Sequence, residues 1–443
     1  MYDRREQVQA HSFLAARLDS AVLRTDPDAV ERPLRRTSAG VLGGIGVGVL
    51  VIGGVLVTSL LTSRGDGAWR APGTLVVDED TGNRYLLAEG RLRPVLNYAS
   101  AKLLLGKDMK VAKVHTKDLA GTPQGAPVGI VGAPDVLPAS PAAQPWTVCT
   151  AESKQAPQVS VTIGALAGVT EVPAEQALLV RSGDGLHLVW RDRRFRVTAP
   201  WAPRALGLDP AGAQAADPAW LNTLTAGPDL GSPKLARGGA GPVIGGRPTT
   251  VGQLVSVPDA VGGTSYVVAS GGLVPVTATV AALAAADPEA KGVQTLEITT
   301  AQLATQTVLP APAWQAELPA SPPMAAKAEN RFFCVRWAND RAVLVTAPPP
   351  SGRGRGDGPG VTRDGQVADR VEVTPGAGLL ARTRAAPGVA GAGIYLITES
   401  GAKYPVASTD AAAALGLGAD AAPQVPPDLL ALLPTGPVLD RIT

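Results

Sequence analysis

The chain has 443 residues, 45% of them hydrophobic and 18% charged, so it can bury a sizeable core and is long enough for two or three folded units. Its formal net charge of +2 gives no support for binding nucleic acid or acidic substrates. The 51 glycines and 40 prolines, about a fifth of the chain, predict many turns and few long helices, and the seven tryptophans should anchor local packing.

The first element expected is an amphipathic helix over residues 5–24. Ala10, Leu14 and Leu18 recur there near helical spacing, with Arg and Gln residues opposite, and the helix should end near Pro27. A lone helix cannot bury its own apolar stripe, so this one should dock on a cytoplasmic partner or rest on the inner leaflet of a membrane. The mixed charge of its polar face favours the partner.

Next comes Val41–Leu61, which contains no charged or amide residue. A helix of this length measures about 31 Å, close to the roughly 30 Å core of a bilayer, which predicts one transmembrane helix over 40–61. A cleaved signal peptide would begin nearer the N-terminus, and a buried helix of a soluble protein is seldom so apolar. Arg32, Arg35 and Arg36 precede the span, so the N-terminus should be cytoplasmic and the bulk of the chain extracytoplasmic.

The predicted span is rich in glycine. Gly40, Gly44 and Gly48 are spaced four apart and should lie on one helix face. This ladder would let another helix approach closely and predicts self-association in the membrane. The alternative is that glycine is simply common in membrane helices.

A pattern then recurs four times along the rest of the chain, over 72–107, 176–210, 250–290 and 377–418. Each copy reads as a strand, a hairpin turn, a second strand, a turn, a short strand and a short helix. The predicted fold class is therefore α+β, with four small β-β-β-α repeats in a β-rich extracytoplasmic domain.

A larger repeat lies over these four. LPASP occurs at 137–141 and again at 318–322, at the same distance of 52 residues after Tyr85 and Tyr266 respectively. Each is followed by an apolar stretch with a cysteine, Cys149 or Cys334. We expect the two cysteine strands to meet in a central sheet, although recurrence of LPASP by chance is the alternative.

Cys149 and Cys334 are the only cysteines, and both lie on the predicted outer side. Two cysteines outside a cell are expected to form a disulfide, and two free buried thiols are the alternative. A metal site is disfavoured because the chain has no CxxC and its three histidines are far apart.

The chain is expected to divide into nine segments. These are an N-terminal segment (1–39), the span (40–61), repeat 1 (72–107), a first stretch of the central β-domain (108–170), repeat 2 (176–210), repeat 3 (250–290), a second stretch of the central β-domain (293–376), repeat 4 (377–418) and a C-terminal docking tail (419–443).

Known catalytic and phosphate-binding motifs are absent from the sequence. The sequence has no GxxxxGK[ST] phosphate loop, HExxH or GxSxG, so we predict no catalytic, cofactor-binding or metal-binding residues. The insertion 348–360 contains Arg-Gly-Asp, which is interpreted as chance in a Gly-, Arg- and Pro-rich loop. Arg191, Arg193, Arg194 and Arg196 form a basic strand pair in repeat 2, which could contact anionic wall polymer or a partner, or could be a solvated sheet face.

The combination resembles EccB, a single-pass core component of the type VII (ESX) secretion system, over essentially the whole chain. The matching features are residues 7–14 (QVQAHSFL), residues 33–35 (PLR), the four repeats, Cys149 in WTVC, Cys334 before VRW, and residues 433–439 (LPTGPVL). The insertion after Val345 has no counterpart in the family pattern.

The resemblance implies a cytosolic N-terminus, an elongated outer domain with four repeats around a central β-domain, and one disulfide, Cys149–Cys334. It also implies a membrane complex with the EccC motor ATPase, EccD and EccE, association with a mycosin protease, and handling of exported proteins. The first hypothesis is thus a non-enzymatic structural subunit of a protein secretion complex. The alternatives are an ATP hydrolase, an activity sometimes attached to the family, and a cell-wall-binding module.

Overall fold

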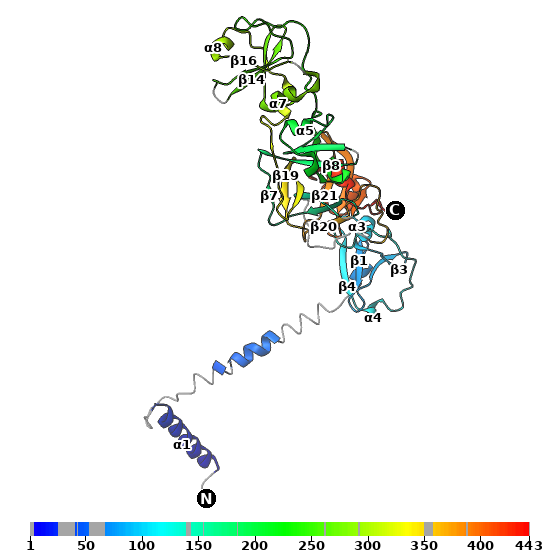
Figure 1. Ribbon diagram of the computed structural model, residues 1–443. Coiled ribbons are helices and arrows are strands. Elements are labelled where there is room, and N and C mark those ends of the chain that lie inside the picture. Colours follow the sequence, from blue (N-terminus) through cyan, green and yellow to red (C-terminus); the bar gives the residue numbers. More distant parts are fainter. Residues whose placement is uncertain are drawn as a thin grey trace. The chain divides into compact units, whose positions relative to one another are not determined.

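The computed structural model describes residues 4–24, 40–41, 43–52, 67–138, 143–153, 155–183, 185–260, 263–290, 293–349, 358–386 and 389–442 (Figure 1). It divides into two compact units, Met1–Ala71 and Pro72–Thr443. Each unit is described by itself.

In the first unit the expected N-terminal helix is present as α1 (Arg4–Arg24). Residues 40–41 and 43–52 are also helical, and a short 3-10 helix, η1 (Ala68–Arg70), follows later. Residues 42 and 53–66, which include much of the predicted span, lie outside the described residues. Within the described ranges, no helix combines the length and the apolar character needed to cross a membrane.

Repeat 1 opens the second unit. Its elements are β1 (Thr74–Asp78), β2 (Arg84–Ala88), β3 (Arg91–Pro94), α3 (Tyr98–Leu105), β4 (Lys110–Val114) and α4 (Thr116–Leu119). The sheet order is β3-β2-β1-β4, in which β1, β2 and β3 are antiparallel and β4 is parallel to β1. Asn97 caps α3 by accepting a hydrogen bond from the Ser100 amide at 2.9 Å, which defines where the helix begins.

The same order of elements occurs three more times. Repeat 2 has β8 (Gln176–Ser182), β9 (Gly185–Trp190), β10 (Arg193–Arg196), α5 (Ala202–Ala205), β11 (Gln214–Ala215), α6 (Pro218–Asn222) and β12 (Thr225–Ala226), with β17 (Met324–Ala325) added to β8. Repeat 3 has β13 (Leu254–Val257), β14 (Thr264–Ala269), β15 (Gly272–Val276), α7 (Ala278–Ala286), β16 (Leu296–Glu297) and α8 (Thr300–Leu303). Repeat 4 has β21 (Leu379–Ala386), β22 (Val389–Ile397), β23 (Lys403–Val406), α9 (Thr409–Ala414), β24 (Gln424–Val425) and α10 (Pro427–Ala431).

The predicted β-β-β-α unit lacks one strand of the repeat that the structure shows. In every repeat a further strand follows the first helix and pairs in parallel with the first strand, as β4, β11, β16 and β24 do. Three of these strands have only two residues, too few for an alternating pattern, and backbone hydrogen bonds alone place them. The predicted ends at 107, 210, 290 and 418 all fall before this strand.

A closing segment runs parallel to the third strand in all four repeats, through the single pair Leu273↔Val308 in repeat 3 and through two pairs in repeats 1, 2 and 4. The paired residues in repeats 1, 2 and 4 are Leu92↔Gln124 and Val95↔Val128, Arg194↔Ala226 and Val197↔Leu230, and Lys403↔Thr435 and Val406↔Leu439. Between its two pairs, each of these three closing segments has one residue more than the third strand beside it. Each of the three therefore contains a bulge. The predicted docking tail is thus the last portion of repeat 4.

A glycine follows the first pair in each of these segments: Gly125, Gly227 and Gly436. A Cβ added to Gly227 would lie 2.4 Å from the Phe195 ring, and one added to Gly436 would lie 2.3 Å from the Tyr404 ring. The segment can therefore lie against the third strand only because this side chain is missing.

Substituting this glycine should destabilise repeat 4. We expect Gly436→Ala to cost about 1–3 kcal/mol, because Tyr404 is 5% exposed and its ring has little room to move. Thermal unfolding of the full chain measures the effect. Gly418→Ala is the matched control, since its Cβ would meet no atom within 4 Å. Equal melting temperatures for the two variants would contradict the argument.

The central sheet has the order β20-β6-β5-β18-β19-β7. Its strands are β5 (Trp146–Ala151), β6 (Gln158–Ile163), β7 (Thr170–Glu171), β18 (Phe332–Ala338), β19 (Arg341–Ala347) and β20 (Arg370–Val373). The two cysteine strands, β5 and β18, are antiparallel neighbours at its middle. The predicted central stretches 108–170 and 293–376 also included β4 and β16, which belong instead to the sheets of repeats 1 and 3.

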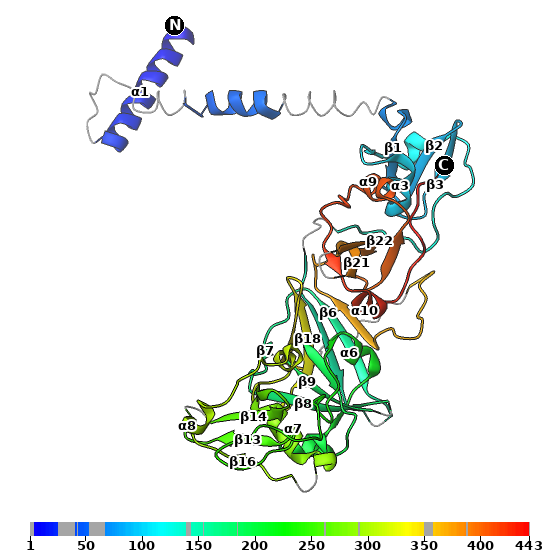
Figure 2. The same ribbon diagram turned by 90° about the horizontal axis from the view of Figure 1, so that it is seen from above.

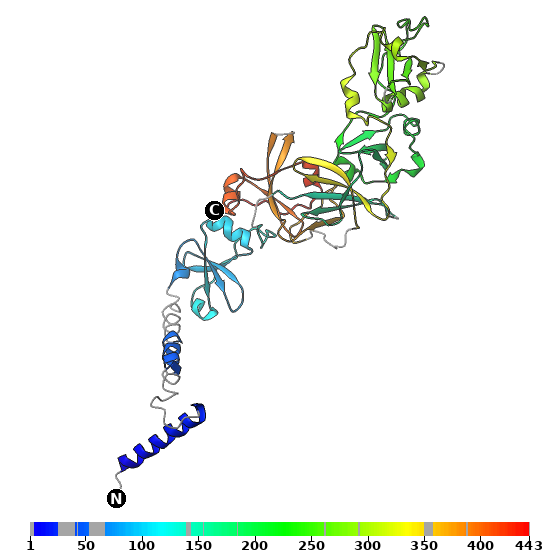
Figure 3. The same cartoon turned by 90° about the vertical axis from the view of Figure 1, so that its left-hand side faces the viewer.

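The repeats contact one another in pairs through their helices. Leu103 of α3 packs in one apolar cluster with Ala411 and Ala412 of α9, joining repeats 1 and 4, whose helices lie side by side in Figure 2. Likewise α5 and α7 join repeats 2 and 3. A third apolar cluster contains residues of the central sheet and of repeats 2 and 4. In Figure 3 the strands of the central sheet lie between the green strands of repeat 2 and the orange strands of repeat 4.

Candidate functional site

The middle of the central sheet holds the two cysteines. Cys149 on β5 and Cys334 on β18 stand directly opposite each other in the register, with their Cα atoms 3.9 Å apart. Their sulfur atoms are joined at 2.08 Å, which confirms the predicted disulfide. Both residues are buried, so the bond joins two segments separated by 185 residues from inside the fold.

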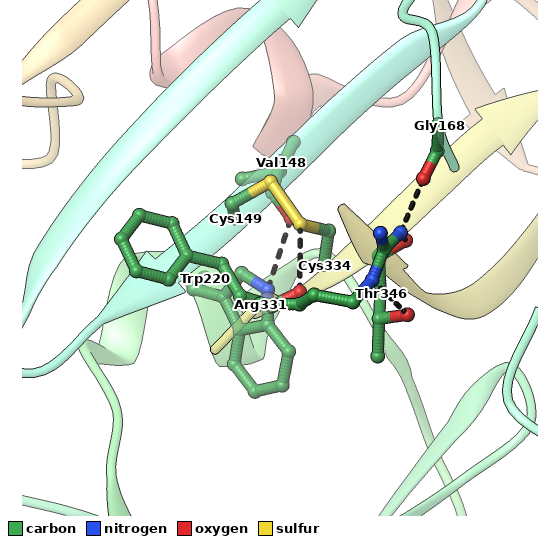
Figure 4. The surroundings of a disulfide bond; sticks show 8 residues. Val148, Cys149, Gly168, Trp220, Arg331, Cys334 and Thr346 are labelled. Carbon is green, nitrogen blue, oxygen red and sulfur yellow. Dashed lines mark hydrogen bonds between the residues drawn. A yellow bond between two sulfur atoms is a disulfide. The ribbon is translucent and has the colours of Figure 1, made fainter. Parts of the chain in front are cut away.

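Arg331 holds one side of this region (Figure 4). Its Nε donates to Thr346 Oγ1 at 3.0 Å and its Nη2 to the Thr346 carbonyl at 2.8 Å, and Nη2 also donates to the Gly168 carbonyl. The guanidinium thus ties the segment before β18 to the end of β19 and to the loop before β7. Charged hydrogen bonds of this kind are among the stronger ones in proteins.

Trp220 holds the other side of β5. It is completely buried, and its Nε1–H donates to the Val148 carbonyl at 3.1 Å, next to the disulfide. The residue lies on α6 of repeat 2, so it joins that repeat to the central sheet. Neither Arg331 nor Trp220 was singled out from the sequence, although the scarcity of aromatic residues suggested that each tryptophan would anchor packing.

The basic strand pair of repeat 2 is largely engaged within the chain. Arg193 forms an ion pair with Glu317 at 2.7 Å, Arg194 donates to Asn222, and the Arg191 guanidinium lies 4.4 Å from the centre of the Trp190 ring. Arg196 is exposed and is held by the backbone pairing of β10 with β9. Arg193 therefore joins repeat 2 to a neighbouring segment, whereas the side-chain contacts of Arg191 and Arg194 lie within repeat 2.

His187 faces this basic group from β9, where it pairs with Arg196 in the register. Burial lowers its pKa, and the charges of Arg194 and Arg196 lower it further. Its Nδ1 is buried without a hydrogen-bond partner among the described residues. Burial and the two neighbouring charges therefore disfavour the protonated imidazole of His187.

This predicts a loss of stability in acid. Because the pKa of folded His187 lies below its usual value of 6.5, the unfolded chain binds the proton more readily. The contribution of His187 to the free energy of unfolding should be complete above pH 6.5. It should decrease as the pH falls through 6.5 toward the pKa of the folded state. We expect His187→Gln to flatten the dependence of the melting temperature on pH over this range. An unchanged slope would contradict the assignment.

The histidines, weighed above for a metal site, and the glycines of the predicted span lie as follows. His115 Nδ1 lies 3.1 Å from Asp80 Oδ1 in an exposed turn. Among the residues that the structure describes, no group of three or more His, Cys, Asp or Glu is placed to hold a metal ion. Gly40, Gly44 and Gly48 are helical, and a Cβ on any of them would meet no atom within 4 Å, so their role in helix packing stays a prediction.

Comparison with known proteins gives the decisive observation. The family model described as "Type VII secretion system ESX-1, transport TM domain B" matches residues 2–443. The chain belongs to the EccB family. The resemblance stated from the sequence is thereby confirmed over almost the whole chain.

Individual EccB proteins match at similar length. The chain is 28% identical to the "ESX-5 secretion system ATPase EccB5" of Mycobacterium marinum, over 99% of this chain and 92% of that protein. It is 29% identical to the "ESX-3 secretion system ATPase EccB3" of Mycolicibacterium smegmatis, over 99% of this chain and 89% of that protein.

Two solved structures share the fold of this EccB chain. One is a chain of an intact ESX-5 inner membrane complex, with a TM-score of 0.70 and 26% identity over 100% of this chain and 94% of that one. The other is the EccB3 dimer from the ESX-3 core complex, with a TM-score of 0.66 and 26% identity over 83% of this chain and 98% of that one.

Proposed function

We propose that this chain is a structural subunit of a type VII secretion membrane complex and helps to assemble the channel and its extracytoplasmic domain. The observation that carries the proposal is the match along the entire chain to a subunit of an assembled ESX-5 inner membrane complex. The partners are a second copy of the chain, the EccC-type motor ATPase, EccD, EccE, a mycosin protease and the exported proteins.

Affinity purification of the tagged chain after gentle solubilisation of its native membrane tests this function. We expect EccC-, EccD- and EccE-type proteins to copurify in fixed ratio, and deletion of the chain to abolish export. A chain that purifies alone from intact membranes, or that is dispensable for export, would contradict the proposal.

The proposed topology is a single membrane helix over 40–61, with residues 1–39 in the cytoplasm and Pro72–Thr443 outside. A buried disulfide supports an oxidising compartment for the second unit. Four repeats around the disulfide-linked central sheet then form the extracytoplasmic domain. Protease added to intact cells should cleave a site engineered into the exposed turn at Gly263 and leave a site before Arg4 intact.

The glycine face of the predicted span provides a contact between copies. Replacing Gly44 with leucine should weaken self-association in membranes, because the bulky side chain prevents close approach of two helices. Gly46→Leu is the matched control, since Gly46 lies about 200° around the helix from Gly44. Equal effects of the two changes on crosslinking between copies would contradict this contact.

ATP hydrolysis is the second candidate, and the observation in its favour is that the matched relatives carry the word ATPase in their names. Against it, the sequence has no phosphate loop of the GxxxxGK[ST] type. Saturable ATP hydrolysis by the purified chain, abolished by one substitution, would favour the enzyme over the structural subunit.

Binding to cell-wall polymer is the third candidate and depends on the basic strand pair. Arg193 is the residue of this strand pair chosen for the test, and it already forms an ion pair with Glu317. Retention of the chain on isolated wall that is lost with Arg193→Ala and at high salt would favour this candidate.

A further inference from the structure

A cavity of about 330 Å³ lies at one end of the central sheet, beside repeat 4. Trp146 of β5 and Trp337 of β18 line it, and they stand directly opposite each other in the register, so both indoles lie on the same face of the sheet. Pro423 and Pro426, on either side of β24, line it as well. The size is at the lower end of the roughly 300–1,000 Å³ typical of ligand pockets.

The indole N–H of Trp146, at this cavity, lacks a hydrogen-bond partner within the described residues. Trp146 is 3% exposed, yet its Nε1–H makes no hydrogen bond there, whereas Trp190 and Trp220 both donate to backbone carbonyls. Trp146 lines the cavity, so the cavity is the place from which a ligand could reach this N–H. A buried indole N–H normally has a partner, so this donor is available for a ligand.

Three amide side chains line the same cavity without a hydrogen bond to any described residue: Gln144, Asn339 and Gln424. Each adds donors at the rim. The carboxylate of the cavity, Asp340, is by contrast paired with Arg384 at 3.4 Å, and Arg384 also lies 4.4 Å from the centre of the Trp337 ring. The cavity thus offers free donors beside the indole of Trp337, over which Arg384 lies, while its one carboxylate is ion-paired.

A second cavity, of about 590 Å³ between repeats 1 and 4, differs in this respect. Its Asn97 donates to the Ile130 carbonyl at 2.8 Å, and its Glu399 accepts from the Gly376 amide at 2.7 Å. These polar side chains are occupied by the fold itself. The smaller cavity is therefore the better candidate for a binding site.

We propose that the cavity between Trp146, Trp337 and β24 binds a proline-containing segment of a partner protein in the polyproline II conformation. Such a segment has no internal hydrogen bonds, so its carbonyls are free to accept, and proline has no N–H that would need an acceptor. Its rings pack on aromatic side chains, which is the usual mode of recognition for this conformation. The Trp146 N–H and the amides of Gln144 and Gln424 supply the donors that the carbonyls require.

The test measures the binding of a fluorescent oligoproline peptide to the purified full chain by polarisation. A glycine–serine peptide of the same length is the control ligand. We expect saturable binding of oligoproline alone, weakened about tenfold or more by Trp337→Ala, which removes the ring, and by Trp146→Phe, which keeps a ring but removes the N–H. Trp201→Phe, outside the cavity, should leave the affinity unchanged.

Gln424→Ala and Gln144→Ala change rim side chains that make no hydrogen bond in the described fold, so they report on binding even if a tryptophan variant fails to fold. Their combined effect should be a loss of several-fold in affinity with an unchanged melting temperature. No saturable binding of oligoproline, equal binding of both peptides, or affinity that is insensitive to all the cavity variants would overturn the proposal. So would competition by a soluble wall oligosaccharide together with no response to oligoproline.

Discussion

Replacing Cys149 and Cys334 together with alanine is expected to lower the free energy of unfolding of the central sheet by about 2–5 kcal/mol. The bond closes a loop between residues separated by 185 positions, so its loss frees a long stretch of the unfolded chain. The two strands would keep their backbone pairing, but the chain between them, which contains repeats 2 and 3, would no longer be tethered in the unfolded state. Urea unfolding, followed by the fluorescence of the buried tryptophans, measures the change.

The reduced wild-type chain is the control for this experiment. It should unfold at nearly the same urea concentration as the double alanine variant, since both lack the crosslink and differ only in two buried sulfur atoms. Reduction should also be slow without denaturant, because Cys334 is 0% and Cys149 5% exposed. A double variant as stable as the oxidised wild type would show that the crosslink is not needed to stabilise the sheet.

Replacing Trp220 with alanine is expected to cost about 3–5 kcal/mol, the usual range for deleting a buried aromatic side chain. The indole packs in the cluster that joins repeat 2 to the central sheet, and its loss leaves a cavity between them. It also leaves the Val148 carbonyl without this donor. We therefore expect the melting temperature to fall and proteolysis to begin in repeat 2.

Trp220→Phe separates the two contributions. It keeps most of the apolar volume but removes the N–H, so the expected loss is smaller, with about 1–3 kcal/mol for the unpaired buried carbonyl. Trp314→Ala serves as a control for loss of an indole that is only partly buried. If Trp220→Ala and Trp314→Ala destabilise the chain equally, the junction does not depend on Trp220.

The recurring hairpins can be predicted from the sequence because their residues obey local rules. In repeat 3, Ser265–Val268 and Leu273–Val276 lie within β14 and β15 as expected. The parallel strand after each helix cannot be predicted in this way, because Leu296–Glu297 carries no periodic pattern and is placed only by pairing with Val255 and Ser256. The role of the tail is hidden for the same reason, since Thr435 and Leu439 are recognisable as belonging to repeat 4 only beside β23.

The surroundings of the disulfide likewise combine features that the sequence predicts with features that only the tertiary structure reveals. Their number and their predicted outer location are enough to expect a disulfide, and the resemblance to EccB agrees with it. Arg331 and Trp220, which hold the strands on either side, come from distant segments, and no local pattern marks them. The free polar groups of the small cavity are equally hidden, since a missing partner can be recognised only after all neighbours are placed.

The sequence alone therefore determined the family, the apolar segment at 41–61, the pairing of the cysteines and the positions of four hairpins. The family follows from the resemblance of the chain's motifs to those of EccB, and the other features follow from composition, spacing and periodicity along the chain. The tertiary structure decided which strand lies beside which, how the helices join repeat 1 to repeat 4 and repeat 2 to repeat 3, and which tryptophans keep an N–H for a ligand. The physical reason is that packing and hydrogen bonding depend on distance in space, whereas residues as far apart along the chain as Leu103 and Ala411 become neighbours only when it folds.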